Sequence, residues 1–219
     1  MSAPPVPEEL TKAVMDDLQP VTPLAPVWRR TLWVLAVSAL VFAAAVLGLG
    51  LRSDLQDIPT WLGWGCSIIE FLAAALLLGL ALRESIPGRS LPLGSVLTVL
   101  AACIIYQLTV GYITWRFSSG LPWEDHPLAH GMSCMVSDTM LALPTLLVTV
   151  WLIVRAYPTR AWMAGMLGGA GAAIASDAIT HLQCPVSDMR HVLVWHTGAV
   201  IFISAAGALI GLFWGRWRA

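Results

Sequence analysis

Long apolar stretches alternate with short polar segments along most of the chain. Six of these stretches hold about 20 residues each, which is enough to span the hydrocarbon core of a bilayer. Their predicted limits are 28–51, 61–82, 93–115, 135–154, 161–182 and 192–214. Because a bilayer core offers the backbone no water to bond with, these spans are expected to be helices. The pattern predicts an all-α, polytopic membrane protein with six transmembrane helices.

The first 27 residues follow a different pattern. Leu10, Val14 and Leu18 fall on one face of a short helix, and acidic residues that include Asp16 and Asp17 occupy much of the rest. Helices that lie on membranes usually carry basic polar faces, so this acidic helix favours a groove in a protein partner over the lipid surface. We therefore divide the chain into a cytoplasmic partner-binding tail, residues 1–27, and a transmembrane domain, residues 28–219.

Composition and charge agree with this division. Hydrophobic residues make up 58% of the chain and charged residues 11%, whereas soluble domains carry about 25% charged residues. If the N-terminus is cytoplasmic, only Arg52, Arg116 and Arg190 of the 12 basic residues face outward. This positive-inside bias predicts a multi-pass protein of the bacterial inner membrane with both termini in the cytoplasm. The net charge of −1 and the lack of a basic patch predict no direct contact with nucleic acid.

Two of the four cysteines are predicted near the outer ends of the fourth and fifth spans. These are Cys134 and Cys184, and both have polar neighbours. An oxidising outer compartment permits a disulfide there, although the alternative of two unrelated thiols stays open because spacing alone does not establish proximity. Cys66 and Cys103 lie among apolar residues and are expected to be small packing residues.

Ionisable residues surround the two outer cysteines in the sequence. A polar cluster is predicted from helical spacing and from the cost of ionisable groups inside spans. Its expected members are His130, Asp138, Asp177, His181 and His196. The cluster either tunes the thiols or fixes the packing of the helices through hydrogen bonds, and the two roles are compatible.

A metal site is a further possibility at the same end. His130, Cys134, His181 and Cys184 together offer two nitrogen and two sulfur ligands, a set that suits zinc. These residues are scattered along the chain, and the sequence does not show that they converge. No resident cofactor is predicted, and a soft or heavy metal ion enters only as a possible signal.

Several short segments resemble one known family over essentially the whole chain. Residues 17–21 read DLQPV and are followed by Pro26 and by Arg29 and Arg30; residues 130–134 read HGMSC, residues 181–185 read HLQCP and residues 194–196 read VWH. These segments resemble the negative regulator of sigma F proteins, which are six-span anti-sigma factors of bacterial inner membranes. The resemblance implies that the tail holds an extracytoplasmic-function sigma factor. It also implies that Cys134 and Cys184 sense oxidative or heavy-metal stress from the periplasm, with no enzymatic activity.

Two other classes of function remain open from the residues alone. One is a membrane thiol/quinone or haem redox protein, which a visible absorption band would reveal. The other is a small transporter that uses Glu70, Asp138 and Asp177, and it leaves the tail helix without a role. A disulfide and a bound ion both stay open as the state that Cys134 and Cys184 adopt.

Overall fold

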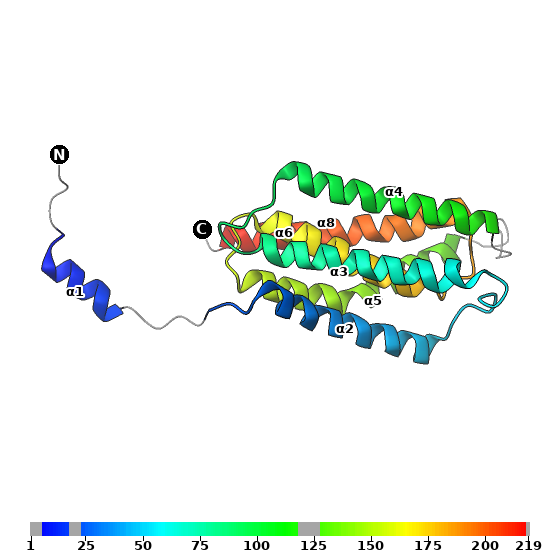
Figure 1. Cartoon of the computed structure of the whole chain (residues 1–219), viewed down its shortest axis with the longest axis horizontal. Helices are drawn as coiled ribbons and strands as arrows, with labels where there is room; N and C mark the ends of the chain where they lie inside the picture. Colours follow the sequence, from blue (N-terminus) through cyan, green and yellow to red (C-terminus); the bar gives the residue numbers. More distant parts are fainter. Residues whose placement is uncertain (1–5, 18–22, 118–127, 218–219) are drawn as a thin grey trace.

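The computed structural model describes residues 6–17, 23–117 and 128–217, and the regular elements within these ranges are helices. Figure 1 shows a bundle of long helices that run side by side, preceded by one short helix. The elements are α1 (Glu8–Asp17), α2 (Val27–Leu49), η1 (Trp61–Gly65), α3 (Cys66–Glu84), α4 (Leu93–Phe117), α5 (Leu128–Val154), α6 (Ala161–Thr180), α7 (Met189–His191), η3 (Val192–His196) and α8 (Thr197–Trp217). Two of them, η1 and η3, are π-helical turns that lead directly into α3 and α8.

The long helices match the six predicted spans, and the predicted all-α fold is confirmed. Within the described residues, five helical stretches are long and apolar enough to cross a membrane; they are Val27–Leu49, Trp61–Glu84, Leu93–Phe117, Gly131–Val154 and Met189–Gly215. The sixth long helix, α6, is rich in glycine and alanine and is not one of these five. It is nevertheless suited to its position, because nearly all of its residues are buried against other helices rather than facing lipid.

Helix α6 is the centre of the bundle, and it packs against α3, α5 and α8. Figure 1 shows it between α3 and α8, while α2 and α4 lie along opposite edges of the bundle. Two glycines of α6 allow close contact with the backbone of α8. A Cβ atom at Gly165 would collide with the backbone of Gly207, and one at Gly169 would collide with the backbone of Ile203. Small residues at such crossings let helix backbones approach closely, which is how helices gain packing energy inside a membrane.

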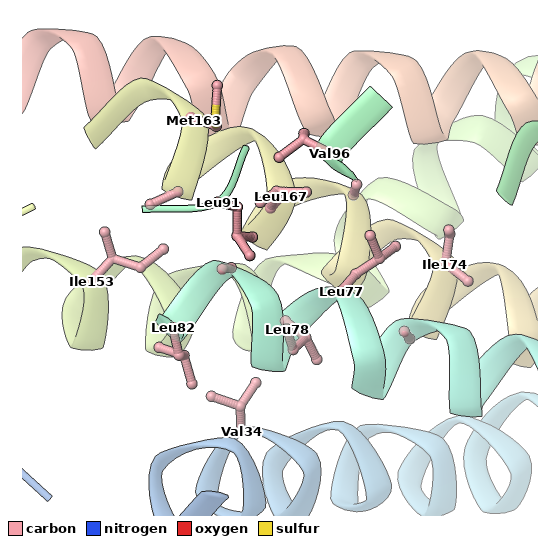
Figure 2. Close-up of a cluster of buried hydrophobic side chains, with 14 of the residues drawn as sticks. Val34, Leu77, Leu78, Leu82, Leu91, Val96, Ile153, Met163, Leu167 and Ile174 are labelled. Carbon is pink, nitrogen blue, oxygen red and sulfur yellow. The ribbon is translucent and has the colours of Figure 1, made fainter. Parts of the chain in front are cut away.

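The largest apolar core fills the space between α2, α3, α5 and α6. Figure 2 shows Leu77 and Leu78 of α3 between Val34 of α2 and Leu167 of α6, and Ile153 of α5 joins the same cluster. These five side chains are at most 2% exposed. Large apolar residues elsewhere on α2, α3, α4, α5 and α8 are exposed, as expected for surfaces that contact lipid.

Buried charged groups tie the helices together at the end of the bundle where α2 begins. Arg30 of α2 donates to the backbone oxygen of Leu152 at 2.5 Å. Glu84 of α3 is fully buried; it pairs with Arg160 at 2.7 Å and accepts the backbone N–H of Leu91 at 2.6 Å. Each buried charge therefore has a partner, as burial requires. We call this end of the bundle the tail end, because the chain enters α2 there from the N-terminal residues.

The short helix α1 matches the amphipathic helix predicted in the tail. None of its residues is buried, and Leu10 and Val14 are 56% and 53% exposed. Asp16 and Asp17 are exposed as well, at its C-terminal end. Leu18, the third residue of the predicted apolar face, lies outside the described residues.

Candidate functional site

Cys134 and Cys184 meet at the end of the bundle opposite the tail end. Cys134 lies in the second turn of α5, and Cys184 lies in the link between α6 and α7. Their sulfur atoms are 3.7 Å apart, both thiols are free, and Cys184 is buried. A disulfide bond of about 2.05 Å would form after the two sulfurs approach by roughly 1.7 Å. The two cysteines are therefore neighbours, and we call this end of the bundle the cysteine end.

Cys134 lies inside α5 because the helix begins at Leu128 rather than at residue 135, where the sequence predicted its start. The polar segment before Cys134 is helical and packs against η3. A Cβ atom at Gly131 would overlap the indole ring of Trp195. Glycine at this position thus lets α5 continue past the predicted limit, and it brings the HGMSC and VWH segments into contact.

Two histidines complete a compact group around the cysteines. The Nε2 atom of His191 lies 3.4 Å from the Cys184 sulfur, and the rings of His191 and His196 are 5.4 Å apart between centroids. In an α-helix, residues five apart point about 140° away from each other. The π-helical turn η3 follows His191 and ends at His196, and its wider turn brings residues five apart to the same side. This turn is the local feature that brings both rings to the cysteines.

Buried carboxylates form the next layer beneath this group. His196 Nδ1 lies 2.8 Å from an oxygen of Asp177, whose other oxygen accepts from the side-chain amide of Gln107. Asp138 accepts hydrogen bonds from Ser176 at 2.9 Å and from Thr180 at 2.7 Å, and its second oxygen is 3.9 Å from His196 Nδ1. The predicted residues Asp138, Asp177 and His196 thus belong to one hydrogen-bonded network that joins α5, α6 and η3.

Glu70 of α3 lies at the edge of this network. It is 1% exposed and helps to line a cavity of about 30 Å³ that Asp177, Cys184 and His196 also line. A cavity of this size holds one or two water molecules or a single ion. The network is therefore polar and nearly filled, with little free space beside the thiols.

The link that carries Cys184 is fastened to the far end of α2. Gln183 donates from its side-chain amide to the backbone oxygens of Ala45 and Gly50, at 3.0 and 3.1 Å. Arg52 donates its backbone N–H to Leu182 at 2.9 Å and its guanidinium to Ser187 at 3.0 Å. We call these contacts of Gln183 and Arg52 the α2 latch.

Arg52 also binds a carboxylate next to the latch. Its guanidinium forms two hydrogen bonds with Asp54, at 2.5 and 2.7 Å. These bonds hold the pKa of the Asp54 carboxyl below its usual range. Asp54 therefore stays ionised and keeps Arg52 oriented toward the link.

The two remaining predicted histidines have other surroundings. His181 Nε2 lies 3.1 Å from the backbone oxygen of Leu62, at the start of η1. His130 lies in the first turn of α5, and its side chain is outside the described part of the chain. The predicted metal ligands therefore converge only at Cys134 and Cys184 within the described residues.

Sequence reasoning missed His191, which lies in the predicted outer loop 183–191 just before the last span. Four ligand atoms, one each from Cys134, Cys184, His191 and His196, all lie within 4.8 Å of one another. The spacing of two histidines five residues apart in HVLVWH was the available signal, but it has no α-helical period and was passed over. A second set, Asp138, Asp177 and His196, is equally compact and consists mainly of oxygen ligands.

A family model described as negative regulator of sigma F matches residues 15–217, which is nearly the whole chain. No curated protein and no solved structure matches it.

Proposed function

The chain belongs to the negative regulator of sigma F family, and we propose that it is a membrane-bound anti-sigma factor whose N-terminal tail sequesters an extracytoplasmic-function sigma factor. In this proposal the protein spans the bacterial inner membrane six times, with both termini in the cytoplasm and the cysteine end toward the periplasm. Oxidation of Cys134 and Cys184, or capture of a heavy metal ion by them, releases the sigma factor. The observation that carries the proposal is the 3.7 Å separation of the two sulfur atoms.

The redox step needs only an oxidant that reaches the cysteine end. The two thiols form one disulfide bond and give up two electrons and two protons, which reduce one molecule of hydrogen peroxide to two molecules of water. The pair is suited to this step because Cys134 is only partly buried, whereas Cys184 is buried and sits beside His191 at 3.4 Å. The oxidant therefore reacts first with Cys134 and converts its thiol to a sulfenic acid. The thiol of Cys184 then attacks this sulfenic acid, and the disulfide forms.

The output is the apolar face of α1. Leu10 and Val14 are largely exposed in a helix of 10 residues, and a helix this short is marginally stable in water on its own. Docking in a groove of the sigma factor would bury both side chains and stabilise the helix at the same time. The acidic residues Asp16 and Asp17 would then face basic groups at the rim of that groove.

The α2 latch supplies a physical route between the two ends. Gln183 and Arg52 hold the link that carries Cys184 against the far end of α2, and α2 is a continuous helix that leads back to the tail. When the two sulfur atoms approach each other by roughly 1.7 Å to form the disulfide, this link is pulled toward α5. A displacement of the link moves α2 through the latch, and the tail moves with it.

The energy required for release is small. A tenfold loss of affinity for the sigma factor corresponds to about 1.4 kcal/mol, and a disulfide that closes a long loop contributes a few kcal/mol in chain-entropy models. The bridge must favour one arrangement of the bundle over the other, because a ligand or bond shifts an equilibrium only by its preference between two states.

The test measures thiol state and sigma binding on the same sample. The full chain in lipid nanodiscs, bound to a purified extracytoplasmic-function sigma factor from the same cell, is treated with dilute hydrogen peroxide. Mass spectrometry then maps any bridge, and the sigma factor that dissociates is measured. We expect a reversible Cys134–Cys184 disulfide and release of the sigma factor.

The double variant Cys134→Ser, Cys184→Ser should keep its sigma factor under oxidant, while the matched control Cys66→Ser, Cys103→Ser should respond as the natural chain does. Normal release from the Cys134→Ser, Cys184→Ser variant under both oxidant and metal would contradict the sensor part of the proposal. A chain that never binds the sigma factor would contradict all of it.

A further inference from the structure

We propose that Cys134, Cys184, His191 and His196 form a four-ligand site for one thiophilic d10 cation, such as Zn²⁺ or Cd²⁺. This inference deepens the proposed function, because it names the ligand that the cysteine pair takes and adds two histidines to it. The four ligand atoms come from α5, the link after α6, α7 and η3, and they already lie within 4.8 Å of one another.

The sulfur–sulfur and sulfur–nitrogen separations match the edges of a tetrahedral metal centre. With metal–sulfur bonds of about 2.3 Å and metal–nitrogen bonds of about 2.0 Å, the expected sulfur–sulfur edge is about 3.8 Å and the sulfur–nitrogen edge about 3.5 Å. The Cys134–Cys184 sulfur separation is 3.7 Å, and Cys184 Sγ lies 3.4 Å from His191 Nε2. The cysteine end therefore needs little rearrangement to receive an ion.

His196 is prepared for the role of ligand by its neighbours. Its Nδ1 faces Asp177, which also accepts from Gln107, so Asp177 acts as an acceptor and Nδ1 carries the proton. In its neutral form the ring presents the lone pair of Nε2, and a metal ion that binds there takes the place of any proton on that atom. That atom is buried and has no hydrogen-bond partner among the described residues. A carboxylate behind a histidine in this way is the usual second layer of a zinc site, where it fixes the ring and strengthens the ligand.

The donor set also selects the ion. Two thiolates and two imidazoles favour a soft or borderline cation over Mg²⁺ or Ca²⁺, which prefer oxygen ligands. Four protein ligands fill a tetrahedral centre and leave no open position, which is typical of structural rather than catalytic zinc. The ion displaces one proton from each thiol and joins α5 to α7 and η3. The carboxylate set that shares His196 is the weaker candidate, because it would use the Nδ1 atom that already faces Asp177.

The first experiment measures binding to the reduced, metal-free full chain in detergent. Co²⁺ is the probe, because a tetrahedral Co²⁺ centre with thiolate ligands has characteristic visible and charge-transfer bands; Zn²⁺ and Cd²⁺ then compete with it. We expect one ion per chain. His191→Asn and His196→Asn should each weaken binding at least about 100-fold, and Asp177→Asn about 10- to 100-fold. The matched control His181→Asn should bind within about threefold of the natural chain, because His181 faces Leu62.

X-ray absorption by the loaded natural chain gives the same answer without a variant, in case a substitution at the buried His196 prevents folding. Two sulfur and two nitrogen ligands support the site, whereas oxygen-dominated coordination or a sulfur-only set overturns it. Zinc that copurifies at one ion per chain would identify a resident ion. An apo chain that takes Cd²⁺ at one ion per chain would identify an incoming one, and failure of the reduced chain to bind any of these ions overturns the inference.

Sigma release separates this inference from the proposed function. If peroxide releases the sigma factor from a chain that binds no metal ion, the cysteine switch is supported and the metal site is overturned. If the chain binds one ion through all four ligands but still holds its sigma factor in the presence of metal and of oxidant, the metal site is supported and the switch is overturned.

Discussion

The cysteine end and the tail helix differ in almost every physical respect. At the cysteine end, Cys184, Asp138, Asp177 and His196 are at most 6% exposed and engage polar or sulfur atoms of neighbouring elements. Helix α1 has no buried residue, and the hydrogen bonds described for it are its own backbone bonds and two that Thr11 donates, from its backbone N–H and its hydroxyl, to the backbone oxygen of Pro7. The cysteine end is therefore already packed within the bundle, whereas the surface of α1 is open for a partner to bind.

In the proposed function, the two ends carry out different parts of one signal. A network of buried polar groups is costly to rearrange unless the groups stay satisfied, so it responds to a specific chemical change rather than to thermal motion. A short exposed helix gains most of its order from its partner, so its affinity changes with small changes in presentation. The proposed sensing chemistry thus requires a rigid site, and the proposed sigma-factor binding requires a compliant one.

The largest expected effect comes from the compliant region. Leu10→Asp or Val14→Asp puts a charge on the apolar face of α1, and loss of an apolar anchor in a groove costs about 2 kcal/mol or more. Sigma-factor binding should therefore weaken at least about 30-fold. Titration of the full chain in nanodiscs with labelled sigma factor measures this change, and the thiol chemistry of the cysteine end should be unaltered.

The matched control is Met15→Asp. Met15 is an equally exposed apolar residue of the same helix, at 64% exposure, but it points about 100° away from Val14. It should change binding only slightly. If all three variants bind alike, the tail does not use the face that Leu10 and Val14 share, and the contrast between the two regions loses its functional meaning.

A smaller effect is expected from the rigid region. Gly169→Ala puts a Cβ atom 2.5 Å from the backbone oxygen of Ile203, where α6 crosses α8. Backbone cannot move aside as a flexible side chain does, so the variant should lose about 1–3 kcal/mol of unfolding free energy. Unfolding in detergent, followed by circular dichroism, measures the loss.

Gly198→Ala is the control for this change, since a Cβ atom at Gly198 meets nothing within 4 Å. Alanine is the better helix former, so this variant should be neutral or more stable by about 0.5–1 kcal/mol. Equal loss in both variants would mean that helix propensity, rather than close packing of α6 on α8, decides the rigidity of the bundle.

The sequence predicts the six spans well because each depends only on the length of one apolar run. Helix α6 is the instructive case, since its glycines and alanines lower its hydropathy while they fit it for the centre of the bundle. The start of α5 was placed too late, because the polar residues before Cys134 look like loop. Their helical structure depends on contact between Gly131 and Trp195, which lie far apart in the sequence.

The candidate site is only partly predictable for a related reason. Cys134 and Cys184 were expected together because both follow from the limits of spans on one side of the membrane. His191 and His196 were not paired, because a spacing of five residues puts them on different sides of an α-helix and only the π-helical turn brings their rings together. His181 was grouped with Asp177 by its spacing, whereas its ring reaches the backbone of Leu62 on another element. Contacts that depend on irregular turns or on a neighbouring helix leave no periodic signal.

The smallest expected effect tests the connection between the two regions. Gln183→Ala removes two hydrogen bonds that hold the link of Cys184 against Ala45 and Gly50 of the α2 end. Each such bond contributes about 0.5–1.5 kcal/mol. The disulfide should form at the natural rate, while the coupling that carries it to the tail weakens by about 1 kcal/mol. The peroxide dose for half-release of the sigma factor should rise roughly fivefold.

Gln56→Ala is the matched control, because Gln56 is an exposed glutamine of the same segment after α2. Its response to peroxide should equal that of the natural chain. A Gln183→Ala variant that oxidises and releases its sigma factor at the natural dose would show that the signal leaves the cysteine end by another path. The contacts of α5 with α8 would then be the next candidates, because they also run from the cysteines to the tail end. A variant that forms the disulfide but never releases the sigma factor would instead show that α2 carries the whole signal.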